Sequence, residues 1–118
     1  MLILNHKKLD VWQIAMEFVT AIYKVTKNFP KEELYGLTNQ MRRAAVSIAS
    51  NIAEGSARSS SADRKRFYEI SRSSLVEVDT QLEIAQNLKF VDKNNLIELE
   101  PFLDEIFAKI SNLMKSIK

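Results

Sequence analysis

The arginines are the first chemical signal in this chain of 118 residues, because all six lie between residues 42 and 72. A guanidinium group binds phosphate or carboxylate oxygens through a rigid fork of donors, so a cluster suits a polyanion or an acidic neighbour. Residues 40–72 carry seven basic side chains against three acidic ones. The pattern favours one basic face, and the candidate nucleic-acid-binding residues are Arg42, Arg43, Arg58, Arg64, Lys65, Arg66 and Arg72.

The acidic residues have the opposite distribution. Residues 73–105 carry eight acidic side chains against two lysines, although the net charge of the chain is only +2. Oppositely charged surfaces on one small domain can steer a polyanion to the basic side. They can equally dock copies of the chain, basic side to acidic side, and both interpretations stay open. Docking would pair the arginines with Glu77, Asp79, Glu83, Glu98, Glu100, Asp104 or Glu105.

Few aromatic residues accompany the arginines, which weakens the case for RNA in particular. Phe67 is expected in the core, which leaves Tyr68 alone to stack on a base. The pattern therefore indicates an electrostatic contact more strongly than it indicates a nucleic acid.

Catalytic and metal chemistry find little support. The chain has no cysteine, and its one histidine, His6, is expected to be exposed in a flexible N-terminal segment, residues 1–9. There is no Glu-x-x-His pair for a di-iron bundle and no glycine-rich phosphate loop. We therefore predict no enzyme activity, no metal, no cofactor and no small-molecule substrate.

Three polar residues, Gln40, Asn51 and Glu54, form a second candidate cluster. The favoured interpretation is structural: they satisfy backbone groups of the following loop or pair with Arg58 or Arg43. The alternative is a ligand site or a catalytic carboxylate, but the sequence offers no second group of complementary chemistry.

No apolar stretch reaches 18 residues, so we expect no membrane span. The apolar run at the start is too short for the core of a signal peptide. The absence of cysteine fits a reducing compartment, and the prediction is a cytoplasmic protein.

Apolar periodicity predicts four helices, at residues 10–28, 37–54, 61–89 and 93–117. Asp10 and Asp92 are expected N-caps, and Ser60 with Asp63 resembles a capping box. Gly36 is expected to supply an unusual backbone angle, and Gly55 a left-handed stop after the second helix.

The apolar stripes differ in character between the helices. The second helix is rich in alanine and serine, which allows a neighbouring helix to approach closely. In the fourth, Pro101 interrupts a heptad pattern and should bend the helix, a break restarting there being the alternative. The first has an apolar arc wide enough to indicate an oligomer surface. The core stripe of the third is predicted to be Phe67, Ile70, Ser74, Val78, Leu82, Ala85 and Leu88.

Four amphipathic helices with short connections predict an all-α fold, an antiparallel up-down-up-down four-helix bundle. The bundle should form one domain over residues 10–118.

Residues 35–55, YGLTNQMRRAAVSIASNIAEG, resemble the signature of a bacterial four-helix-bundle family encoded in intervening sequences of 23S ribosomal RNA genes. The opening Leu9-Asp10-Val11-Trp12 is similar as well, and so are Phe67, Glu77 and Gln81-Leu82 of the third helix. The small residues usual in that helix are replaced here by Ser71-Arg72-Ser73-Ser74.

The resemblance implies an up-down bundle that assembles into a ring-shaped homopentamer. A related accessory protein of diversity-generating retroelements is implicated in binding RNA and a reverse transcriptase, while most members have no established function. The prediction is a non-enzymatic ring that binds structured RNA or another nucleic acid. Its rival is a scaffold whose arginines pair between subunits, and a distant third is an enzyme or metal protein.

Overall fold

A computed structural model describes residues 1–118 and consists of helices and turns without any strand. Its helices are α1 (Asp10–Thr26), α2 (Leu37–Ser56), α3 (Ser61–Asn87) and α4 (Lys93–Lys115), with the 3-10 turns η1 (Asn5–Lys8) and η2 (Lys31–Glu33). The all-α prediction is confirmed, and each predicted helix end lies within two residues of the observed one.

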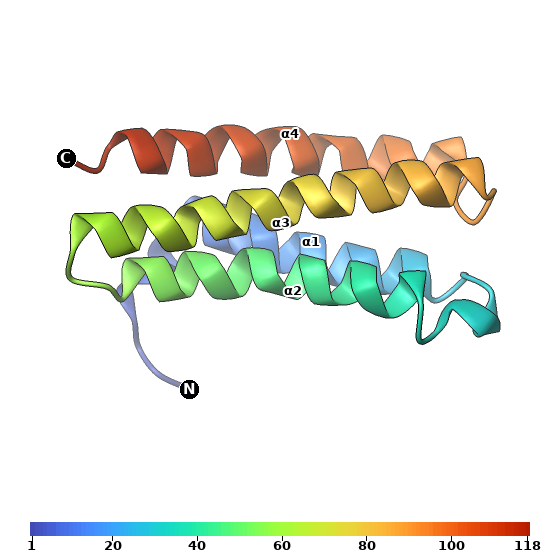
Figure 1. The fold of residues 1–118 in the computed structure, drawn as a ribbon, viewed down its shortest axis with the longest axis horizontal. Helices are drawn as coiled ribbons and strands as arrows, with labels where there is room; N and C mark the ends of the chain where they lie inside the picture. The colour runs from blue at the N-terminus through green and yellow to red at the C-terminus, as the bar shows by residue number, and fades with distance from the viewer.

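Each helix runs antiparallel to the next, and α4 returns to pack against α1 (Figure 1). The diagonal pairs, α1 with α3 and α2 with α4, have no Cα atoms within 8 Å of each other. α3 has 27 residues, which at 1.5 Å per residue span about 40 Å. It therefore runs almost the whole 43 Å length of the molecule.

The core is built from one apolar stripe on each helix and contains 22 buried apolar residues. On α1 the stripe includes Phe18 and Ile22, which have no exposed surface. Phe18 packs against Phe102 of α4, with ring centroids 5.7 Å apart. These large side chains fill the space between α1 and α4.

Small residues bring α2 and α3 close together, as the sequence predicts. The Ser71 hydroxyl donates to the Ile48 carbonyl at 2.7 Å, and the Ser47 and Ser74 hydroxyl oxygens lie 2.8 Å apart. Gly55 faces the same contact. A Cβ atom at this position would lie 2.7 Å from Cε1 of Tyr68 and 3.2 Å from the Arg64 carbonyl oxygen.

The predicted role of Gly55 as a left-handed helix stop is therefore wrong. α2 continues through it to Ser56, and no glycine has a positive φ. The glycine is required by the close approach of the Tyr68 ring instead. Gly36 does have an unusual backbone, with φ −114° and ψ −117°, outside the helical and extended regions.

The predicted core stripe of α3 is right in its middle and wrong at its two ends. Ser74, Val78, Leu82 and Ala85 are buried as predicted. Tyr68 is 1% exposed and belongs to the core, whereas Phe67 is only partly buried and Ile70 and Leu88 are exposed. The buried stripe is Tyr68, Ser71, Ser74, Leu75, Val78, Gln81, Leu82 and Ala85.

Several helix ends match the prediction. Asp92 and Asn95 form a reciprocal capping box, and the Ser60 hydroxyl accepts from the backbone N–H of Asp63. After α3, Lys89 adopts a left-handed φ of 65° and Phe90 N–H donates back to the Ala85 carbonyl. This is a Schellman ending in which lysine replaces the usual glycine.

Pro101 lies inside α4, which runs through it without a break, so the alternative of a restart there is wrong. Both Pro101 and Ile97, four residues earlier, are exposed. Because proline has no N–H, the Ile97 carbonyl receives no helical hydrogen bond from Pro101, and it lies on the solvent side of α4. The predicted bend stays a prediction.

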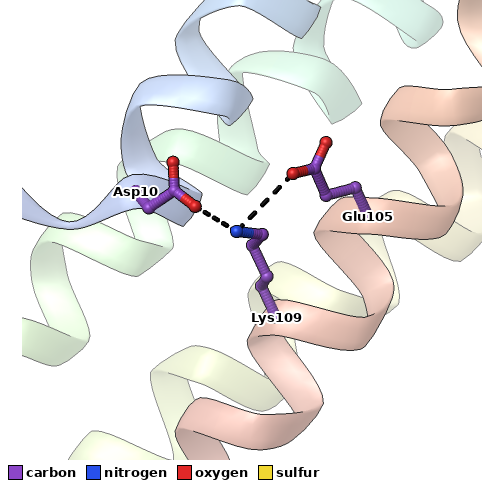
Figure 2. A network of polar contacts seen from close by, with 3 residues as sticks. All are labelled: Asp10, Glu105 and Lys109. Atoms are coloured by element: carbon purple, nitrogen blue, oxygen red, sulfur yellow. Dashed lines mark hydrogen bonds and ion pairs between the residues drawn. The ribbon is translucent and has the colours of Figure 1, made fainter.

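Asp10 was expected to be the N-cap of α1, but it is the first residue of that helix, and Leu9 precedes it as the cap. Its carboxylate contacts the ammonium of Lys109 on α4, which also lies 3.5 Å from Glu105 (Figure 2). The hydrogen bond to Asp10 is the main cause that raises the pKa of Lys109, and desolvation opposes it. The pair ties the start of α1 to α4 at the surface.

Candidate nucleic-acid interface

Arg42 lies between α1 and α2 and is held by groups of its own chain. Its Nε–H donates to the Thr26 hydroxyl at 2.8 Å, and its guanidinium lies 4.6 Å from the centre of the Tyr23 ring. Both partners belong to the last turn of α1, where unpaired carbonyls attract a cation. Arg42 therefore caps the C-terminal end of α1, and only some of its guanidinium N–H groups are left to bind a ligand.

Arg58 and Arg66 share one aromatic ring. Their guanidinium carbons lie 4.6 and 5.0 Å from the centre of the Phe67 ring, close to where α3 begins. Arg58 also forms an ion pair of 3.0 Å with Glu54, one turn earlier in the chain. Phe67 thus holds two cations near one point of the surface. Of the seven predicted basic residues, Arg58 and Arg66 are therefore the pair that the structure brings together.

Arg64 and Arg72 point inward to different extents. Arg64 is partly buried, and its Nε has neither solvent contact nor a hydrogen-bond partner. Arg72 donates to the Ser111 hydroxyl at 3.1 Å and lies 5.7 Å from the centre of the Phe107 ring, so it reaches across to α4. These two arginines contribute to packing as much as to the surface.

Arg43 and Lys65 are the most available cations of the set. Both are exposed, and neither has a hydrogen bond or an ion pair within the chain. Arg43 borders an open hollow of about 630 Å³ on the outer side of α2, beside α1. Its lining is polar and basic: Tyr23, Asn39, Arg42, Arg43, Val46, Ser47, Ser50 and Asn51.

The structure therefore does not gather the seven predicted residues into one cluster. Arg42 turns toward α1, Arg72 turns toward α4, and Arg58 and Arg66 meet at Phe67. Only Arg58 has a carboxylate partner within 4.0 Å. The other six basic residues lack a carboxylate partner in their own chain.

The model of one protein family, described as 23S rRNA-intervening sequence protein, matches residues 7–112. The chain belongs to this family. Among curated proteins, none matches it at a significant level. The match covers all seven basic residues and the polar cluster, while residues 1–6 and 113–118 lie outside it.

The polar cluster of this 23S rRNA-intervening sequence protein is divided in the structure. Asn51 donates from its Nδ2 to the carbonyl and the hydroxyl of Ser47, at 2.8 Å each. Glu54 pairs with Arg58, as the structural interpretation predicts, and Gln40 is exposed without a partner. The Asn51 side chain therefore hydrogen-bonds within its own helix, and not to backbone groups of the following loop as expected.

His6 differs most from its prediction, because it is 9% exposed. It lies in η1, which packs against α1 and α2, and its ring meets Trp12 edge-on at 5.1 Å. His6 also borders a hollow of about 420 Å³ with Glu54 and Ser56. The expected mobility of residues 1–9 stays a prediction.

Phe67 is the functional candidate that sequence reasoning missed. The predicted core stripe includes Phe67 and leaves Tyr68 at the surface, whereas the structure buries Tyr68 and leaves Phe67 only partly buried. The signal was present in the spacing, since Tyr68, Ser71, Leu75, Val78 and Leu82 alternate steps of three and four residues.

No group of three or more histidine, cysteine or carboxylate side chains is placed to hold a metal ion. None of the four helices combines the length and apolar character that crossing a membrane requires.

Proposed function

We propose that this 23S rRNA-intervening sequence protein is a cytoplasmic, non-enzymatic ring of five chains that binds structured RNA or another polyanion. The observation that carries the proposal is the lack of a carboxylate partner for six of the seven clustered basic residues. Exposed, unpaired guanidinium and ammonium groups are suited to phosphate oxygens, whose condensed counterions they replace.

The contacts around Phe67 support the same proposal. Arg58 and Arg66 both lie over its ring, which holds their charges near the start of α3. Acids, not bases, are favoured in the first turn of a helix, so Arg64 at the end of that turn opposes the helix dipole, and Lys65 and Arg66 follow it directly. An anion bound at this end would remove that repulsion.

A titration with a structured RNA at about 50 and 200 mM salt tests the proposal. We expect affinity to fall with salt, and the triple variant R43Q/K65Q/R66Q to bind more weakly. Its slope of log affinity against log salt should be shallower by about one for each phosphate that the variant no longer binds.

The matched control is K24Q/K93Q/K115Q, which removes three exposed lysines and so changes the net charge equally. It should leave binding nearly unchanged. An absence of binding at low salt, or an equal weakening in both triple variants, would contradict the proposal.

A scaffold without nucleic acid is the second candidate function. The acidic segment, residues 73–105, favours it. Of the carboxylates in residues 73–105, only Glu105 has an ion pair within the chain. Arginines and these carboxylates could therefore pair between subunits. The variant R43E/R66E separates the candidates, since a scaffold should lose assembly and an RNA-binding ring should keep its size and lose RNA.

A further inference from the structure

Residues 2–4 form an apolar segment that the bundle leaves uncovered. Leu2, Ile3 and Leu4 are 71%, 98% and 44% exposed. They extend away from the helices below α2 in Figure 1. Lys7 and Lys8 follow after Asn5 and His6, and the Lys7 ammonium contacts the Leu2 carbonyl. Three neighbouring apolar side chains in water favour burial against another surface.

A complementary hollow lies between α3 and α4. It has a volume of about 230 Å³, and Val76 and Phe107 remain 51% and 45% exposed beside it. Its two acidic residues have no cation partner in the chain. The lining consists of Leu75, Val76, Asp79, Leu103, Asp104 and Phe107. An apolar floor with unpaired carboxylates suits an apolar segment that carries lysines.

The segment cannot reach the hollow of its own chain. η1, from which it extends, packs against α1 and α2, whereas the hollow belongs to α3 and α4. Four extended residues span at most about 14 Å. The bundle measures 27 × 21 Å across its long axis. The segment that could fill this hollow is therefore not that of the same chain.

We infer that residues 2–4 of one copy dock into the α3/α4 hollow of the next, with Lys7 and Lys8 beside Asp79 and Asp104. Because the two surfaces lie on opposite sides of one chain, the contact is heterologous and repeats from copy to copy. When the last copy in such a series contacts the first, the assembly is a ring. This inference therefore rests on the ring in the proposed function, and it names the contact that joins neighbouring copies, which we call the joint. It also assigns Asp79 and Asp104 a role that excludes their pairing with arginines of a neighbouring subunit.

Two surface variants test the joint by native mass spectrometry. L2D/I3D changes only exposed side chains of the segment, and V76R places a cation at the rim of the hollow. Each should shift the particle from five chains to a single chain of 13.6 kDa. The control I97D changes a 65% exposed residue of α4 outside the hollow and should keep the ring.

Mixing the two variants sharpens the test. L2D/I3D keeps an intact hollow and V76R keeps an intact segment, so one joint can form between them but a second cannot. The expected product is a heterodimer of one chain of each. Unchanged five-chain particles in both variants would overturn the docking while leaving the ring intact. A single-chain wild-type protein would overturn the docking and the ring together.

Discussion

The contact between α2 and α3 and the contact between α1 and α4 join antiparallel helices in opposite ways. Serine, alanine and glycine bring α2 and α3 together, with hydroxyl bonds such as Ser71 to Ile48. Phe18 and Phe102 fill the α1/α4 contact, and an exposed ion pair from Lys109 to Asp10 lies at its edge. The first contact should be sensitive to added atoms and the second to removed ones.

The largest effect is expected from F18A, which empties the α1/α4 contact. Phe18 has no exposed surface, so its truncation removes buried area and leaves a cavity. We expect a decrease of about 3–5 kcal/mol in the free energy of unfolding, measured by urea denaturation. Y35A, at a 90% exposed ring before α2, is the control and should cost less than about 1 kcal/mol. Equal decreases in the free energy of unfolding for F18A and its control would show that the burial of Phe18 adds no stability.

G55A should break the α2/α3 contact by adding one methyl group. In an exposed helix this change stabilises by about 1 kcal/mol. Here the new Cβ would meet the Tyr68 ring at 2.7 Å, and the ring is buried and cannot retreat. We expect a net destabilisation of about 1–2 kcal/mol. In a double-mutant cycle, Y68L should cost less in the G55A background than alone, and additive effects would contradict the steric explanation.

Much of the fold could be predicted from the sequence, because long apolar stripes and few glycines or prolines specify four helices. The errors arose where polar or small residues occupy the core. Ser71 is buried in α3, and a stripe that passes over this small polar residue takes in Phe67 and Ile70 in place of Tyr68 and Ser71. Gly55 looks like a helix end because the Tyr68 ring that requires it lies on another helix.

The candidate site was less predictable than the fold. The clustering of arginines in sequence was visible, but their partners come from other helices. Arg42 binds Thr26 of α1 and Arg72 binds Ser111 of α4, and neither contact follows from spacing along one helix. Likewise, nothing in the sequence placed His6 against Trp12.

S71A sharpens the comparison by removing one hydroxyl from the α2/α3 contact without adding volume. Ser71 has no exposed surface and donates to the Ile48 carbonyl at 2.7 Å. We expect a destabilisation of about 0.5–1.5 kcal/mol in thermal or urea unfolding. S73A, two residues later on the exposed side of α3, should change stability by less than about 0.5 kcal/mol. Similar values for both would show that the buried hydroxyl adds nothing.

The smallest effect is expected from K109M at the edge of the α1/α4 contact. Because folding raises the pKa of Lys109, its ion pairs stabilise the fold at neutral pH, and this contribution disappears as pH rises through the folded-state pKa. The melting temperatures of wild type and K109M should therefore differ slightly at pH 7 and converge as the pH rises above the folded-state pKa of Lys109. High salt should reduce this difference in melting temperature. A difference that grows at alkaline pH would contradict the stabilising role of the Lys109 ion pairs.

The most direct measurement is the native mass of the particle purified from cells, taken together with its absorbance ratio at 260 and 280 nm. We expect five chains of 13.6 kDa each, carrying nucleic acid that is released by high salt. A single chain free of nucleic acid would contradict both the ring and the binding of a polyanion.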